Sequence, residues 1–126
     1  MKINRTERGW IGHFCLGYNC LFRRNTLLEN DNYSIVVSTV GYLTEDGTPH
    51  TKIKTIGCYH YFETMVFHAN DTKWKDPDIS REVDVPLKSQ SKDKNGEQEA
   101  NDIHESVVDY VMGKMYLGEI KTIGEC

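Results

Sequence analysis

The sequence predicts an α+β fold, in which a twisted antiparallel sheet of about five or six strands has a C-terminal helix packed on it. Three observations lead to this prediction. Residues 1–85 contain short β-branched and aromatic runs separated by turn residues, residues 88–98 contain no apolar side chain, and residues 99–117 repeat apolar side chains at helical spacing. With 126 residues, we expect a single domain over 1–126.

The first strands are predicted in the N-terminal third. Residues 9–16 place aromatic and aliphatic side chains on alternating faces, and residues 21–28 form a second run. The Asn- and Asp-rich stretch 29–32 predicts a tight hairpin, after which residues 33–40 give the strongest strand pattern of the chain. Because both faces of this strand are apolar, we expect it at the centre of the sheet.

The remaining strands are separated by clearer turn signals. An Asp-Gly pair within residues 44–49 predicts a turn, so that residues 50–56 return antiparallel. Residues 59–69 form a fifth strand, and residues 79–85 an edge strand that Pro86 ends. These strands make residues 1–85 mainly β.

A flexible loop over 86–98 leads to the helix predicted over 99–117. Acidic residues near its start favour its N-terminal end through the helix dipole, and Gly118 ends it. One stripe of the helix carries the apolar side chains of Ile103, Val107, Val108, Val111 and Met115. We expect this stripe to pack on the sheet.

Charge is distributed unevenly along the chain. Lys and Arg number 15 against 19 Asp and Glu, a net charge of −4. Residues 1–92 carry 12 basic and 11 acidic side chains (12 − 11 = +1), and residues 93–126 carry 3 and 8 (3 − 8 = −5). Without a strongly basic face we do not expect a long nucleic acid as partner, whereas a small anion held by a few arginines fits the composition.

No apolar run approaches the length of about 18–20 residues that crosses a bilayer, and the N-terminus has no apolar signal region. We therefore expect no membrane partner and a protein that stays in the compartment where it is made. We expect that compartment to be reducing and the four cysteines to be thiols.

Several residues are of types that bind zinc, but their spacing does not match a structural zinc site. The segments containing Cys15-x4-Cys20 and Cys58-x-His60 differ from the usual paired spacing. His13 is a further residue of this kind. We predict buried thiols and no metal ligands.

No catalytic signature is present in the sequence. The glycines are scattered, which argues against a phosphate-binding loop, and His104-Glu105 lacks the second histidine of a helical metalloprotease. We therefore predict no catalytic residues, no cofactor and no enzymatic activity.

The adjacent pair Arg23 and Arg24 lies within a predicted strand, so the two side chains point to opposite faces. An inward guanidinium needs an anionic partner. One alternative is a structural ion pair with Glu63 or another strand carboxylate, and the other is a ligand phosphate. Aromatic residues on the same predicted sheet, which a nucleotide base could stack on, include Trp10, Phe14, Phe22, Tyr59, Tyr61 and Phe62.

Two polar helix residues, Asn101 and His104, share a helix face because they lie three apart. They form either a solvated edge of the helix or, if the helix covers the mouth of the sheet, an amide and an imidazole for a purine or ribose. His60 and His68, by contrast, are expected as hydrogen-bonded core histidines.

Five segments together resemble the first type of Thoeris anti-defence sponges, a family of small phage proteins. They are Gly9-Trp10-Ile11-Gly12-His13-Phe14, Phe22-Arg23-Arg24-Asn25-Thr26-Leu27, Ile35-Val36-Val37-Ser38-Thr39-Val40-Gly41, Tyr61-Phe62-Glu63-Thr64-Met65 and Ala100-Asn101-Asp102-Ile103-His104-Glu105. The resemblance implies a protein that acts in the cytoplasm of the infected bacterium. It binds a cyclic ADP-ribose isomer made from NAD by a bacterial TIR-domain sensor, without hydrolysing it, so that the downstream effector stays inactive.

The resemblance also implies a homodimer with ligand pockets near the subunit interface, and in some members a hexamer that holds cyclic oligonucleotides. Combining it with the residue patterns, we predict that the ligand is bound by Trp10, His13, Arg23, Arg24, Tyr61, Asn101 and His104. Two other functions fit the sequence. One is a small module that binds a host protein, and the other is an enzyme that degrades a cyclic nucleotide with His13, His60 or His104 as acid or base.

Overall fold

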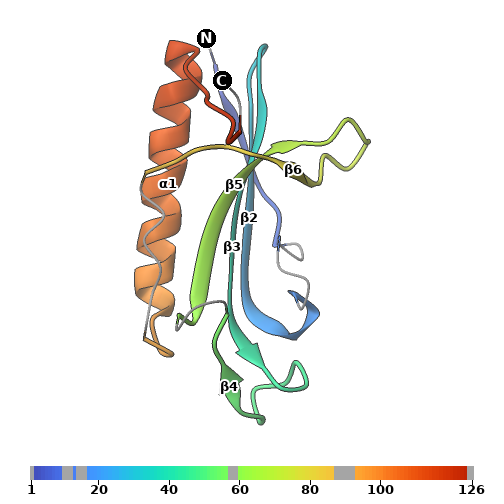
Figure 1. Ribbon diagram of the computed structural model, residues 1–126, viewed down its shortest axis with the longest axis vertical. Coiled ribbons are helices and arrows are strands. Elements are labelled where there is room, and N and C mark those ends of the chain that lie inside the picture. The colour runs from blue at the N-terminus through green and yellow to red at the C-terminus, as the bar shows by residue number, and fades with distance from the viewer. Residues whose placement is uncertain (1, 10–12, 14–16, 57–59, 87–92, 125–126) are drawn as a thin grey trace.

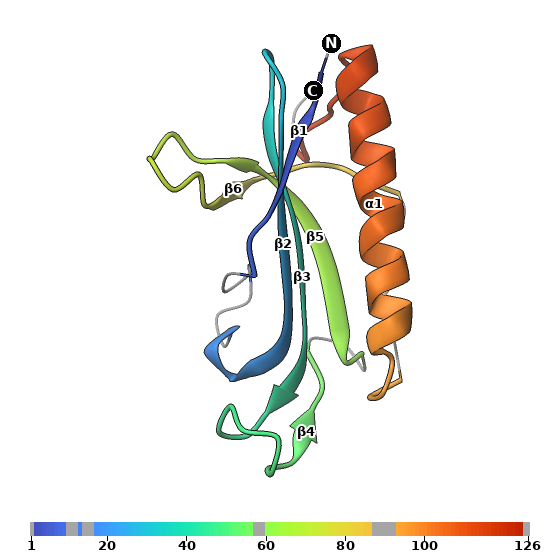
Figure 2. The ribbon, with the colours of Figure 1, turned by 180° about the vertical axis from the view of Figure 1, so that it is seen from behind.

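The computed structural model describes residues 2–9, 13, 17–56, 60–86 and 93–124. In chain order the elements are β1 (Asn4–Glu7), the 3-10 turn η1 (Gly17–Asn19), β2 (Cys20–Glu29), β3 (Ser34–Thr44), β4 (Ile53–Lys54), β5 (Phe62–Ala69), β6 (Pro77–Glu82) and α1 (Glu97–Leu117). Helix α1 lies along one face of the sheet (Figure 1, Figure 2). The predicted α+β class, an antiparallel sheet with a C-terminal helix packed on it, is confirmed.

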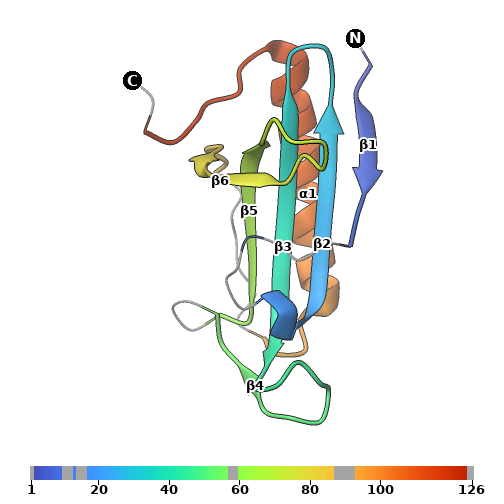
Figure 3. The ribbon, with the colours of Figure 1, turned by 90° about the vertical axis from the view of Figure 1, so that its right-hand side faces the viewer.

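The sheet is antiparallel throughout, with the strand order β1-β2-β3-β5-β6, and β4 pairs with the far end of β3 (Figure 3). Strand β3 is central, as predicted from its two apolar faces. The hairpin before it is closed by Asn30, whose side-chain oxygen accepts the backbone N–H groups of Asn32 and Tyr33 at 2.9 and 2.8 Å. Such local bonding is the reason that Asn favours tight turns.

Alternation along the strands gives the sheet a helix face, which packs on α1, and an outer face, which points away from it. On β2, Arg24, Thr26 and Leu28 contact α1 or its core, so Arg23 and Asn25 belong to the outer face. The two adjacent arginines therefore point in opposite directions, as the strand pattern predicted.

The main core lies between α1 and the helix face. Valine and methionine side chains of the predicted helical stripe are almost completely buried there. The core contains Leu28, Ile35, Val37 and Val66 from the sheet and Val107, Val108, Val111 and Met115 from α1. Each of these side chains contributes about 1.5–3 kcal/mol when fully buried, so the stripe is sufficient to hold α1 on the sheet.

Some elements differ from the sequence prediction. Strand β1 was not predicted, because all four of its residues are exposed and show no apolar alternation. Only two residues of the predicted strand 50–56 pair with β3. The edge strand predicted at 79–85 is β6, which spans Pro77–Glu82, so it begins earlier than predicted and ends before Pro86. Most of the predicted strand 9–16 lies outside the described residues. Near β4, the positive φ of 52° at Tyr42 interrupts the alternation of β3.

Among the described residues, no helix is both long enough and apolar enough to cross a membrane.

Candidate functional site

A chain of hydrogen bonds, which we call the His104 network, crosses the buried layer between α1 and the sheet. His104 is fully buried, and its ring nitrogens lie 2.7 Å from the hydroxyls of Thr26 and Thr39. Thr39 bonds Thr64 at 2.7 Å, and Thr26 donates to the Glu7 carboxylate at 2.6 Å. The network therefore ties α1 to β1, β2, β3 and β5.

The chemistry of these groups fixes the direction of each hydrogen bond. Burial, and then the charge of Arg24, lowers the pKa of His104 to about 4, so its ring is neutral at pH 7. Because the Glu7 carboxylate only accepts, Thr26 gives it its proton, and Nε2 of His104 must donate to Thr26. Nδ1 of the neutral ring then accepts from Thr39. Both ring nitrogens are used within the protein.

Charged side chains close the network where it reaches solvent. Arg24 binds Glu7 and Glu105 at 2.9 Å each, and Arg5 binds Glu105 at 2.6 Å. The hydrogen bond from Arg5 is the main reason that the pKa of Glu105 falls to about 2. Burial alone would raise the pKa of Glu7, but hydrogen bonds from Arg24 and Thr26 outweigh it and lower the pKa.

The inward arginine is therefore Arg24, and it forms the structural ion pair that was one of the two sequence alternatives. Its partners are Glu7 and Glu105 rather than Glu63. Arg23 is exposed on the outer face, and within the described part of the chain no ion pair or side-chain hydrogen bond engages it. The two arginines thus differ in how far the protein itself neutralises them.

On the outer face, four polar residues form what we call the His13 cluster. His13 Nδ1 lies 2.9 Å from Ser38 Oγ, and its Nε2 lies 2.7 Å from Oε1 of Glu63. The backbone N–H of His13 also donates to Ser38 Oγ at 3.3 Å. His60 Nε2 lies 3.4 Å from the second Glu63 oxygen. The cluster fastens residues 13 and 60 to the middle of the sheet.

The order Ser38, His13, Glu63 is that of a nucleophile, a base and a carboxylate in many hydrolases. The hydrogen bond from His13 lowers the pKa of Glu63 against the opposing effect of burial, so the carboxylate is ionised and accepts from Nε2. In the neutral ring, Nδ1 then accepts the Ser38 proton. Ser38 is fully buried. Its hydroxyl group forms a hydrogen bond with Nδ1 of His13, and its oxygen also accepts the backbone N–H of His13.

A second, partly buried contact on the outer face joins Arg8 and Asn25. The Arg8 guanidinium donates to Asn25 Oδ1 at 2.8 Å and to the backbone carbonyls of Trp74 and Lys75 at 2.7 and 3.1 Å. Burial lowers the pKa of Arg8. Nδ2 of Asn25 is buried and has no hydrogen-bond partner among the residues that the structure describes, which is uncommon in folded proteins. The contact fixes the turn before β6 against the N-terminal segment.

Tyr61 lines a cavity of about 380 Å³ at the β4 end of the sheet, together with residues 52–55. The Tyr61 carbonyl accepts the backbone N–H of Tyr42 at 3.2 Å, which holds the residue beside β3. Lys52 and Lys54 belong to the same lining. The cavity thus combines an aromatic ring with two cationic side chains.

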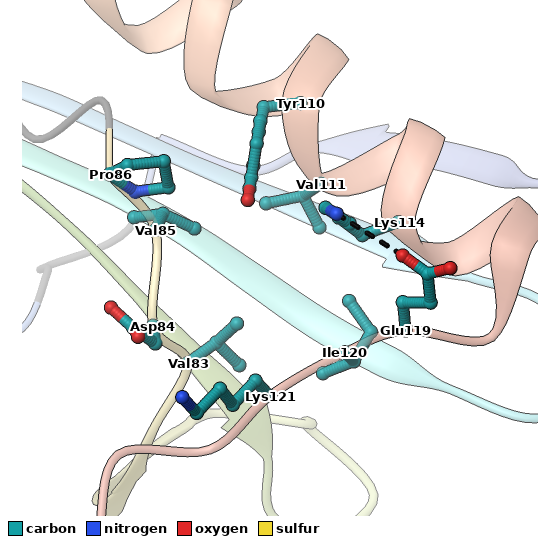
Figure 4. A pocket seen from close by; sticks show the side chains of 10 residues that line it. All are labelled: Val83, Asp84, Val85, Pro86, Tyr110, Val111, Lys114, Glu119, Ile120 and Lys121. Carbon is teal, nitrogen blue, oxygen red and sulfur yellow. Dashed lines mark hydrogen bonds and ion pairs between the residues drawn. The ribbon is translucent and has the colours of Figure 1, made fainter.

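Two further cavities lie elsewhere. Figure 4 shows one of about 270 Å³ between α1 and residues 83–86, where Lys114 and Glu119 form an ion pair of 3.2 Å. Another, of about 440 Å³, lies beside the hairpin at residues 30–34. Of the residues predicted to bind a ligand, none that the structure describes lines either cavity.

Within the described ranges, no three His, Cys, Asp or Glu side chains are grouped so that they could hold a metal ion. Cys20 is a buried free thiol whose pKa burial raises to about 11, which keeps it protonated and unreactive. Cys15, Cys58 and Cys126 lie outside the described residues.

The residues predicted to bind a ligand are divided between the two faces. On the helix face or on α1 itself lie Arg24, Asn101 and His104. On the outer face or at the β4 end of the sheet lie His13, Arg23 and Tyr61. Trp10 lies outside the described residues. The structure therefore does not gather them around one cavity within a single chain.

Sequence reasoning missed Glu7, Lys52 and Lys54. Glu7 lies on a strand without apolar alternation, so no local pattern identified it as the partner of Arg24. The alternation Lys-Ile-Lys at 52–54 is a signal that could have been used, because alternate residues of a strand share one side.

Comparisons of the chain with protein-family models, with curated proteins and with solved structures gave no match.

Proposed function

We propose that the protein binds and sequesters a cyclic ADP-ribose isomer of the kind that a bacterial TIR-domain sensor makes, and does not hydrolyse it. The observation that carries this proposal is Arg23, an exposed cation with no carboxylate partner among the described residues. Its neighbour Arg24 is already neutralised by two carboxylates. Arg23 is therefore the arginine available for a ligand phosphate, which guanidinium groups bind through two hydrogen bonds.

The nature of the ligand follows from the resemblance to the anti-defence sponges, and other features of the chain support it. Tyr61 offers an aromatic surface beside two lysines, an arrangement suited to a nucleotide. Under this proposal the protein acts in the cytoplasm of an infected bacterium and keeps the defence effector inactive. Assembly into a dimer or a dimer-based hexamer is part of the same proposal.

A second candidate, hydrolysis of the nucleotide, is favoured by the line of Ser38, His13 and Glu63. We rank it lower because a nucleophile must reach its substrate, and the Ser38 side chain is fully buried. Binding without turnover requires none of these groups to react.

Isothermal titration with a cyclic ADP-ribose isomer tests the proposal. We expect heat from the wild type, a large loss of affinity in Arg23→Ala, and wild-type affinity in Arg81→Ala, which removes an exposed arginine of β6. Denaturing the complex and analysing the supernatant by chromatography then separates the two candidates. Intact ligand supports sequestration, whereas a linear product supports hydrolysis. Absence of heat, or unchanged affinity in Arg23→Ala, would contradict the proposal.

A further inference from the structure

The cavity at the β4 end of the sheet has the composition of an anion site. It is lined by residues 52–55 and Tyr61, which include strand β4. Figure 3 shows β4 beside the last residues of β3, with which it pairs. No Asp or Glu of the described residues lines the cavity, and the carboxylates that precede it in the chain are those of Glu45, whose N–H donates to the Lys52 carbonyl, and Asp46, which accepts from Thr51. The lining therefore offers two ammonium groups, a threonine hydroxyl and an aromatic ring, and it contributes no carboxylate that would repel an anion.

The two lysines of this cavity are not neutralised by the protein. Both Lys52 and Lys54 are exposed, and neither has an ion pair with any residue that the structure describes. Lys75 and Lys114, by contrast, are ion-paired with glutamates. The pair at β4 thus leaves two positive charges at one cavity, and these attract an anion over a distance of about 10 Å at moderate salt.

The spacing of the lysines indicates how many anionic groups they can take. A strand rises by about 3.3 Å per residue, so the Cα atoms of alternate residues lie roughly 6.6 Å apart. Lys54 belongs to β4, and Lys52 directly precedes the strand, where its carbonyl continues the pairing by accepting the Glu45 N–H at 3.2 Å; both line the same cavity. Two ammonium groups at this separation, each on a flexible stem, match two linked phosphates better than a single phosphate.

We propose that this cavity binds a diphosphate, with Lys52 and Lys54 each contacting one phosphate group and Tyr61 packing against the adjoining sugar or base. The inference rests on the proposed function for the identity of the natural ligand, a cyclic ADP-ribose isomer, and it adds two lysines that were not among the predicted site residues. The hydrogen bond between the Tyr61 carbonyl and the Tyr42 N–H holds the Tyr61 backbone beside β3.

Titration with inorganic pyrophosphate and inorganic phosphate at low salt tests the inference. We expect pyrophosphate to bind the wild type at least about tenfold more tightly than phosphate, because it engages both charges. Lys52→Ala and Lys54→Ala should each weaken pyrophosphate binding by about tenfold and bring it close to the affinity for phosphate. Lys52→Arg should restore most of the affinity. Lys2→Ala, which removes an exposed lysine next to β1, is the matched control and should bind like the wild type.

Equal affinity of the wild type for the two probes, or wild-type affinity in both alanine variants, would overturn the inference. The cyclic isomer itself distinguishes this failure from that of the proposed function. If the isomer binds both lysine variants as tightly as the wild type, the diphosphate site is refuted and sequestration stands. If pyrophosphate binds in a lysine-dependent way and the isomer gives no heat, the anion site stands and the proposed function is refuted.

Discussion

Replacing His104 by leucine should change how the stability of the protein depends on pH. The imidazole donates one hydrogen bond to Thr26 and accepts one from Thr39 inside the core. A buried hydrogen bond contributes about 1 kcal/mol net, and leucine fills a similar volume but leaves the Thr39 proton without its acceptor. We therefore expect His104→Leu to lower the free energy of unfolding by about 2 kcal/mol at pH 7.

The same histidine destabilises the wild type in acid. Its pKa is about 4 in the folded protein and roughly 6.5 in an unfolded chain. As the pH falls from 6.5 towards 4, the histidine becomes protonated in the unfolded chain but stays neutral in the folded protein. The free energy of unfolding therefore decreases by up to about 1.4 kcal/mol per pH unit. At pH 4.5 this decrease amounts to about 2.5 kcal/mol. It is absent in the leucine variant, because leucine does not titrate.

The cost of the lost hydrogen bonds in His104→Leu and the acid destabilisation of the wild type should be equal near pH 5. Below that pH, His104→Leu should be the more stable protein. Urea unfolding followed by fluorescence at several pH values between 4.5 and 7 measures this difference. Carboxylates with lowered pKa values, such as Glu105, lose their contribution only below about pH 4.5, and they are present in both proteins. His50→Leu, at an exposed loop position, is the control and should show no crossing. A stability difference for His104→Leu that stays constant with pH would refute the reasoning.

Two further predictions concern packing and surface charge. Gly41→Ala should destabilise the protein by about 2 kcal/mol or more, because a Cβ atom there would lie 2.2 Å from the Phe62 ring. Gly113→Ala, where nothing lies within 4 Å of the added atom, should stabilise α1 by about 1 kcal/mol, and denaturant unfolding of both variants checks the pair. Arg5→Ala should cost less than about 1 kcal/mol, because its ion pair with Glu105 is solvent-accessible, and the cost should shrink in 1 M salt. A cost that salt leaves unchanged would contradict an electrostatic origin.

The parts of the fold that could be predicted are those specified by local patterns. Residues 33–40 are apolar on both faces, and the strand they predicted is the central β3. The apolar stripe predicted a helix over 99–117, and α1 spans Glu97–Leu117. Strand β1 could not be predicted in this way, because it is held by pairing with β2 and by the charge of Glu7 rather than by apolar burial.

The candidate site was harder to predict because its contacts join residues far apart in sequence. The strand pattern correctly placed Arg23 and Arg24 on opposite faces, but alternation alone could not decide which one faces inward. That choice depends on Glu105, on a helix some 80 residues away in sequence, and on Glu7 of the unpredicted strand β1. Glu63, the strand carboxylate that the sequence suggests as a partner, lies on the outer face with His13 instead.

The division of the predicted residues between two faces limits how one ligand could contact them. His104 is fully buried and has both ring nitrogens bonded, so it can act on a ligand only through the groups that it positions, such as Glu7 and Thr26. Arg23 lies on the other side of the sheet. Arg23 and Asn101 of one chain therefore lie on opposite sides of the sheet. If both residues contribute to one site, we expect that site to combine Arg23 of one copy with Asn101 of another, and Arg23→Ala and Asn101→Ala proteins mixed together should then regain some binding that neither has alone.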